Sequence, residues 1–196
     1  VRLGGSFSIH ESSASSLVIE FRQRKAYTGF EHQEFVQVLK RKENMAKQVG
    51  NIELYMGPHQ LGAGDNLLQT IVDFIESAQK RLYIAVQELD SHPIAEAIIR
   101  AKQRKVQVKI VLEADYLIEK SSLADPFLPG GEFEPNRILH DAILRAQIKV
   151  NSDFNPHIFH QKFIIRDGTS LLTGSTNFTD TDTSQNLNHI AIIHDP

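Results

Sequence analysis

The spacing of apolar residues becomes regular from about residue 51 of the chain. Short apolar runs at residues 51–57, 81–89 and 106–114 predict strands. Between them, residues 66–80 and 93–105 have apolar positions at helical spacing, which predicts a helix in each segment. This strand-helix alternation indicates parallel pairing through helical crossovers.

The remaining segments complete a single predicted domain. A loop at residues 121–136 precedes a helix at 137–147, and a hairpin at 158–174 precedes a last strand at 189–194. We therefore expect an α/β domain with a mixed, mainly parallel sheet flanked by helices on both faces. Asp65 is expected to cap the helix that begins at residue 66.

Residues 1–50 lack this regularity, and we expect them to be a small N-terminal accessory segment beside a domain of residues 51–196. Residues 16–21 are typical of a strand, whereas residues 31–48 fit either an amphipathic helix or a strand.

Composition narrows the classes of function. The formal net charge of −3 gives no global sign of nucleic-acid binding, so such a site depends on local charge. The chain has no cysteine, which excludes disulfides and thiolate metal sites. No apolar run approaches the roughly 20 residues of a membrane span. We expect a cytoplasmic protein without a transmembrane segment.

The hairpin carries an unusual pair of residues. Asp167 and Gly168 are typical of a two-residue type I′ turn, because both central positions need positive φ. In the strand before that turn, His160 and Lys162 share one face, about 7 Å apart. We expect the opposite face, with Phe163 and Ile165, to be the core face.

Two adjacent basic groups repel each other unless an anion lies between them, and a phosphate is such an anion. Gly174 offers flexible backbone, Ser175 a hydroxyl and Asn177 an amide beside the pair. A structural histidine or a solvated lysine explains either residue alone. The combined spacing argues against coincidence and for a phosphate site.

The segment "HQKFIIRD", followed by "GSTNFT", resembles the HKD motif of the phospholipase D superfamily. The motif residues are His160, Lys162 and Asp167, and the resemblance extends over about residues 51–194. It implies a phospholipase D-like fold and a phosphodiesterase or phosphatidyl-transfer reaction that needs neither metal nor cofactor.

In such a reaction, His160 attacks phosphorus and forms a phosphohistidine. The resemblance implies that Lys162, Ser175 and Asn177 bind the phosphate oxygens. A second histidine, from a second HKD motif, protonates the leaving alcohol. Strand parity turns Asp167 away from the pair, which indicates an orienting or turn-forming role.

The chain departs from the family pattern twice. It has one such motif, so we expect the second from a homodimer partner or from a missing C-terminal half of a longer chain, which the abrupt end favours slightly. Where many members carry a glutamate that holds the histidine, this chain has Asn188. Glu88 or Glu113, each at the end of a predicted strand, is an alternative support.

Three functions are compatible with these residues. The leading hypothesis is a hydrolase that acts on DNA or RNA as a nuclease. The second is a phospholipase D or phosphatidyltransferase acting on phospholipid, with the loop at 121–136 as a docking segment. The third is a non-catalytic phosphate-binding module. We interpret the basic runs at 40–42 and 100–105 as solvated helix faces.

Overall fold

The computed structural model describes residues 5–12, 16–23, 47–117, 133–153 and 155–195. The chain divides into two compact units, Val1–Glu43 and Asn44–Pro196. In the first unit, strands β1 (Gly5–Ser12) and β2 (Ser16–Gln23) pair antiparallel. The prediction of a strand at 16–21 is confirmed. Most of the ambiguous segment 31–48 lies outside the described residues, and its last two residues belong to a strand.

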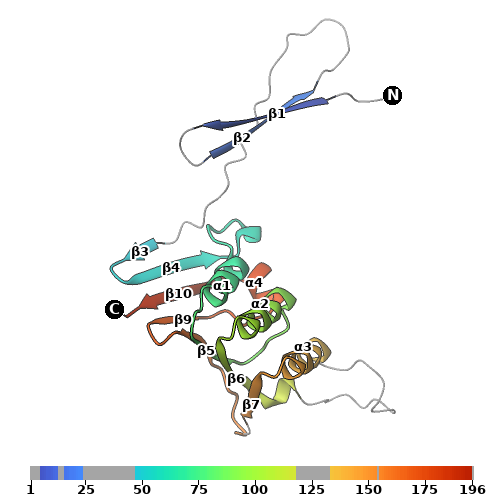
Figure 1. The fold of residues 1–196 in the computed structure, drawn as a ribbon, viewed down its shortest axis with the longest axis vertical. Helices are drawn as coiled ribbons and strands as arrows, with labels where there is room; N and C mark the ends of the chain where they lie inside the picture. Colours follow the sequence, from blue (N-terminus) through green and yellow to red (C-terminus); the bar gives the residue numbers. More distant parts are fainter. Residues whose placement is uncertain (1–4, 13–15, 24–46, 118–132, 154, 196) are drawn as a thin grey trace, which may run out of the picture. The chain divides into compact units, whose positions relative to one another are not determined.

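Within its described residues, the second unit forms one eight-stranded sheet in the order β3-β4-β10-β9-β8-β5-β6-β7 (Figure 1). The strands are β3 (Lys47–Val49), β4 (Ile52–Gly57), β5 (Arg81–Val86), β6 (Gln107–Glu113), β7 (Lys149–Asp153), β8 (Lys162–Arg166), β9 (Ser170–Gly174) and β10 (Asn188–His194). Among these strands, only the pairs β5–β6 and β6–β7 are parallel. The expected α/β class is confirmed, but the expectation of a mainly parallel sheet is wrong.

Chain connectivity explains this error. Strands β5, β6 and β7 are joined by helices α2 (His92–Gln103) and α3 (Glu134–Arg145), and they pair in parallel as the strand-helix alternation predicts. Strands β8, β9 and β10, however, insert between β4 and β5. Each of these three strands pairs antiparallel with its neighbours. Periodicity predicts that a strand exists, but it does not identify the strand's neighbour.

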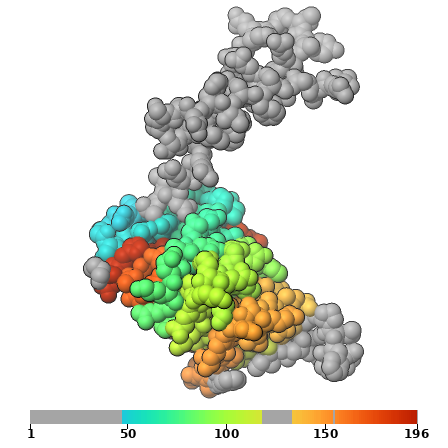
Figure 2. Space-filling view, viewed as in Figure 1, coloured from blue at the N-terminus to red at the C-terminus, as the bar shows by residue number. Residues whose placement is uncertain are grey.

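The three longer helices, α1 (Leu67–Glu76), α2 and α3, lie on one face of the sheet (Figure 1). Helix α1 packs against α2, and α2 packs against α3. Residues of α1 and α2, in green, cover the centre of the face seen in Figure 2. These helices were expected on both faces, and in the described part of the chain they cover one. Shorter helices are η1 (His59–Leu61), η2 (Ala114–Tyr116) and α4 (Asp180–Ser184).

The face of strand β8 that packs on the core is the one opposite to the predicted face. Ile164 is fully buried and Lys162 is 7% exposed, whereas Phe163 and Ile165 are only partly buried. The helices cover the face to which Lys162 and Ile164 belong, so this is the core face. The apolar character of Phe163 and Ile165 suggested the wrong side of the strand.

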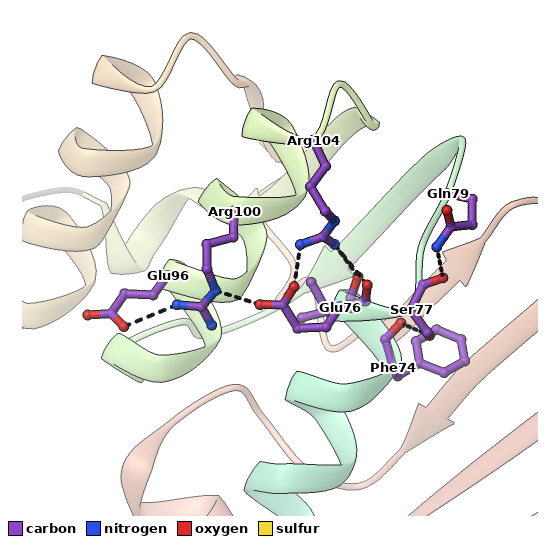
Figure 3. A network of polar contacts seen from close by, with 8 residues as sticks. Phe74, Glu76, Ser77, Gln79, Glu96, Arg100 and Arg104 are labelled. Carbon is purple, nitrogen blue, oxygen red and sulfur yellow. Dashed lines mark hydrogen bonds and ion pairs between the residues drawn. The ribbon is translucent and has the colours of Figure 1, made fainter.

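Ion pairs join α1 to α2 on the surface (Figure 3). Glu76 accepts from Arg100 Nε at 2.5 Å and also pairs with Arg104, while Arg100 reaches Glu96 at 3.5 Å. Arg104 also donates to the carbonyl of Glu76 at 3.0 Å. Exposed pairs of this kind contribute about 0–1 kcal/mol each. Two of the basic residues in the run at 100–105 are therefore already engaged with the protein.

The start of α1 differs from the prediction by one residue. Asn66 is the N-cap, and its side chain accepts from the Gln69 N–H at 3.0 Å. Asp65 instead accepts from the Met56 N–H at 2.7 Å. Asp65 thus stabilises the end of β4, and the cap belongs to the next residue.

None of the helices in the described part of the chain has the length and apolar character needed to cross a membrane.

Candidate functional site

All of the predicted site residues except Asp167 and Glu113 come together where the start of β8, the end of β9 and the start of β10 meet. Strand β8 begins at Lys162, which pairs with Val86 at the end of β5. Strand β9 ends at Gly174, which pairs with Ile190 near the start of β10. The segment before β8, the loop after β9 and the start of β10 therefore share this edge. The fold thus brings His160 and Lys162 to the same edge as Ser175, Asn177, Asn188 and Glu88.

Lys162 is buried, and its amine is held by a neutral side chain. Its Nζ donates to Gln87 Oε1 at 3.1 Å. Burial lowers the pKa of Lys162, because an ammonium loses hydration there, and the negative charges of Asp182 and Glu88 partly oppose this effect. A cation in such a position interacts with a phosphate more strongly than a solvated lysine does.

His160 lies beside Lys162 at an exposed position. Its backbone N–H donates to Ile158 O at 3.1 Å. Within the described ranges, its ring has no hydrogen-bond partner. An exposed imidazole next to a buried cation is suited to attack a phosphate bound at this edge.

Glu113 supports the segment that carries His160. This carboxylate, 3% exposed, accepts from the backbone N–H of Phe159 and from the Asp115 N–H at 3.3 Å. The sequence suggested Glu113 as a substitute partner for the histidine ring. The structure instead has it binding the backbone one residue before His160, which fixes the path of the chain there.

The loop after β9 is held by Asp182, a residue that the sequence analysis missed. Asp182 Oδ2 accepts from the Asn177 N–H at 2.8 Å. Asn188 donates to the Asp182 carbonyl at 3.0 Å and accepts from Ser175 Oγ at 2.7 Å. The carbonyl of Asn188 is thus engaged with Ser175, not with His160.

Within this loop, the buried Asn177 Oδ1 has no partner among the described residues, and Ser175 Oγ also lies 3.2 Å from His189 Nδ1. The polar groups of Ser175 and Asn177 nevertheless lie at the same edge as Lys162. They remain candidates for phosphate binding.

Gly174, the first residue of "GSTN", is constrained rather than flexible. It is the last residue of β9, and a Cβ added there would collide with the backbone carbonyl of His189. Glycine is needed because two backbones approach closely. The expectation that Gly174 supplies flexible backbone is therefore wrong.

Asp167 lies at the other end of β8, seven positions from His160, which is roughly 20 Å along an extended chain. Its Oδ1 accepts from the N–H groups of Lys80 at 2.7 Å and Arg81 at 2.9 Å, and its Oδ2 accepts from Gln79 at 3.0 Å. Partial burial raises the pKa of Asp167, but the backbone donors outweigh this effect and hold the pKa below its usual range.

The turn has the predicted positive φ at both central residues, but the loop is one residue longer than predicted, because Arg166 pairs with Ser170. Asp167 and Gly168 have φ of 56° and 79°, and Thr169 N–H donates to Arg166 O at 3.1 Å. Asp167 thereby joins the hairpin turn to the start of β5, which is a structural task.

Two acidic side chains, Glu88 and Asp182, lie close enough to Lys162 to act on its charge, and Asp90 lies near Glu88. Burial raises the pKa of Glu88, and the charges of Asp90 and Asp182 add to the effect. Burial likewise raises the pKa of Asp90, whose carboxylate accepts from the Asp180 N–H at 3.0 Å. Glu88 lies near the charge of Lys162, which slightly opposes the rise in its pKa.

The sequence analysis also missed Gln87 and Asn136. Asn136, 4% exposed, accepts from the Leu89 N–H at 2.8 Å and interacts with Glu88. Gln87 interrupts the apolar run "YIAV" at the end of β5, and a polar residue there is a signal that could have identified it. Asn136 lies on a helix with no comparable signal.

A pocket of about 280 Å³ adjoins the segment before His160. It is lined by Glu113, Asp115, Tyr116, Phe133 and residues 155–158. Aromatic and carboxylate groups thus lie beside the segment that leads to the histidine.

Comparisons with known proteins show what this chain is similar to. Residues 71–196 match the family model described as "Cardiolipin synthase, PLD-like domain". A phospholipase D from Rickettsia bellii is 34% identical over 125 residues, covering 64% of this chain and 54% of that protein. A mitochondrial cardiolipin hydrolase from Xenopus laevis is 29% identical over 138 residues, covering 70% of this chain and 56% of that protein. The chain spans about half the length of these curated relatives.

A solved structure, that of Nuc from Salmonella typhimurium, a phospholipase D family member, has a TM-score of 0.57 to this chain. It is 24% identical, and the match covers 74% of this chain and 82% of Nuc. This likeness concerns the fold alone.

Proposed function

This chain belongs to the phospholipase D superfamily, and we propose that it is a phosphodiesterase that acts through a phosphohistidine at His160. The observation that carries the proposal is the position of the exposed His160 next to the buried Lys162, at a sheet edge that also holds Ser175 and Asn177.

In the proposed reaction, Lys162 binds a non-bridging oxygen of the diester, and Asn177 and Ser175 supply neutral polar contacts. A nitrogen of the His160 ring attacks phosphorus, and the bond from phosphorus to the leaving alcohol breaks. A second histidine protonates that alcohol. Water then attacks the phosphohistidine and gives its proton to the second histidine, which releases the phosphomonoester and restores both histidines. Lys162 stabilises the negative charge that develops at phosphorus in both steps.

The second histidine belongs to a second motif. We propose that this motif comes from a homodimer partner or from another part of a longer protein. A two-fold homodimer would bring two identical edges together. Asp167 has no role in proton transfer in this scheme, because its carboxylate is occupied by three backbone N–H groups far from His160.

We propose DNA or RNA as the first substrate to test. The reason is that the chain combines a compact domain with a single HKD motif. Phospholipid is the second candidate, favoured by the names of the curated relatives, phospholipase D and cardiolipin hydrolase. The acidic groups near Lys162 also favour this second candidate, since Glu88 and Asp182 repel a polyanion more than a single diester.

The test uses labelled single- and double-stranded DNA and RNA, and vesicles of phosphatidylcholine or cardiolipin, all in excess EDTA. Wild-type protein is compared with His160→Ala and with His140→Ala, a control on helix α3. We expect the wild type and the His140 variant to cleave one substrate class equally and His160→Ala to be inactive. Phosphate binding without any turnover would point to a half-site whose second motif lies in another part of a longer protein, or to the non-catalytic module.

A further inference from the structure

Both the oxygen and the nitrogen of the Gln87 side-chain amide form hydrogen bonds beside the candidate site. This residue follows β5 and is 5% exposed. Its Oε1 accepts from Lys162 Nζ at 3.1 Å, and its Nε2 donates to the Tyr116 hydroxyl at 2.8 Å. Because lysine can only donate, the carbonyl of the amide must face Lys162. The NH₂ group then faces Tyr116, so the amide has one orientation.

The backbone of Gln87 is fixed as well. Its N–H donates to Gln161 O at 3.0 Å, the residue that lies between His160 and Lys162. Gln87 therefore contacts both the main chain of the motif and the lysine side chain. A change at this residue acts on Lys162 directly.

The neutral charge of Gln87 is the informative feature. A buried ammonium is usually paired with a carboxylate, which offsets the loss of hydration. Among the residues that the structure describes, no carboxylate lies within ion-pair distance of Lys162, and Glu88 and Asp182 act on it only through their charge. The amide oxygen orients the amine without neutralising it. The positive charge of Lys162 thus remains available to an anion.

We propose that Gln87 is a positioning residue that orients Lys162 toward the substrate phosphate and keeps its charge free of a direct ion pair. This inference rests on the proposed function of the same site. Tyr116 contributes by holding the other end of the Gln87 amide, while its ring packs against Phe133 at 4.4 Å between centroids.

The test reads Lys162 itself, without turnover. Acetylation of Lys162 by acetic anhydride is followed across pH by mass spectrometry, and binding of inorganic phosphate is measured by calorimetry. In Gln87→Glu, the new carboxylate is expected to raise the pKa of Lys162 by about one unit or more and to weaken phosphate binding by about tenfold, since it competes for the amine.

Gln87→Met is the second variant, because it keeps the size of the side chain and should fold if the buried glutamate does not. It lacks the oxygen that faces the ammonium, so we expect a lower pKa of Lys162 and weaker phosphate binding. The matched control is Gln107→Glu, since Gln107 also bonds a tyrosine, Tyr83, at 3.2 Å, but at an exposed position. It should leave both readouts unchanged.

The outcomes separate the two proposals. If Lys162 titrates alike in wild type, Gln87→Glu and Gln87→Met, the positioning role of Gln87 is overturned. If the wild type neither binds phosphate nor cleaves a diester, the proposed function fails, whatever the titration of Lys162 does.

Discussion

At the scale of single residues, the chemistry of the site depends on how Lys162 is buried. Its side chain lies on the core face of β8, and its amine donates to the side-chain amide oxygen of Gln87. The carboxylates of Glu88 and Asp182 act on the amine through their charge but form no ion pair with it. Low local polarity strengthens the attraction between this cation and a phosphate. His160, by contrast, is exposed, which is what the proposed attack on a substrate requires.

Replacing Lys162 tests its electrostatic role. We expect Lys162→Met to lower kcat/KM by about a thousandfold, because one preorganised charge at the reacting group is worth this much. Lys162→Arg should not restore activity, since the guanidinium does not fit the single amide oxygen of Gln87. Steady-state kinetics measure both variants. Activity within tenfold of the wild type in Lys162→Met would contradict the role.

The pH dependence has a definite sign. Burial lowers the pKa of Lys162, so activity and phosphate binding should fall as pH rises through a range below that of an ordinary lysine. Glu88 opposes this lowering, and Glu88→Gln should therefore move the alkaline limb to still lower pH. Profiles of kcat/KM against pH for both proteins test this. An unchanged alkaline limb, or one moved to higher pH, would contradict this action of Glu88 on Lys162.

At the scale of elements, the β8–β9 hairpin carries the site and is fixed at both ends. Asp167 joins its turn to the segment before β5, and Gly174 lies against the carbonyl of His189 at the other end. These two contacts hold the turn and β9 between them. Lys162, the first residue of β8, lies on this hairpin, and His160 lies in the segment just before it.

Removing the Asp167 carboxylate should affect stability more than binding. Asp167→Ala leaves three backbone N–H groups without their acceptor and places alanine at a φ of 56°, so we expect a loss of about 2–3 kcal/mol in the free energy of unfolding. Asp167→Asn, which tolerates this φ and keeps one oxygen, should lose less. Chemical denaturation measures both, and phosphate binding to the folded variants should be unchanged. Lost binding at full stability would assign Asp167 to the reaction.

The close approach at Gly174 gives a second test. In Gly174→Ala, the added Cβ meets a backbone carbonyl that cannot rotate away, so β9 and β10 must separate. We expect a loss of roughly 2 kcal/mol or more in the free energy of unfolding, and weaker phosphate binding because Ser175 moves with the strand. A variant as stable as the wild type would show that the backbone yields easily there.

How far the sequence predicts these features depends on how local each one is. The hairpin turn, the strands β4 to β6 and the pair His160 and Lys162 arise from neighbouring residues, and all could be recognised from spacing. Gln87 and Asp182 were missed, although the polar Gln87 at the end of an apolar run was a usable signal. Glu113 was suggested as a partner of the histidine ring, but it binds the backbone N–H of Phe159, a contact between distant segments that spacing does not reveal. The core side of β8 was misjudged for a related reason, since the helices that cover Lys162 belong to a different part of the chain.

At the scale of the whole molecule, the site results from the insertion of β8, β9 and β10 between β4 and β5. That insertion brings the end of β5 next to the start of β8, and so places Gln87 and Glu88 beside the motif. The order of strands could not be predicted. The alternation of strands and helices predicts parallel pairing whether or not β8, β9 and β10 lie between β4 and β5. The chain has one motif, so in the proposed reaction the histidine that protonates the leaving alcohol comes from a second copy or from another part of a longer protein.

The most direct test of the account is to trap the covalent intermediate on His160. Bis(p-nitrophenyl) phosphate is a suitable substrate, because p-nitrophenolate leaves without needing a proton and the first step then does not depend on a second motif. After rapid denaturation, peptide mass spectrometry locates the phosphoryl group. The account predicts an adduct on the peptide containing His160, stable in alkali and lost in acid, and none in His160→Ala. Turnover by His160→Ala, or a phosphoryl group on a different residue, would contradict it.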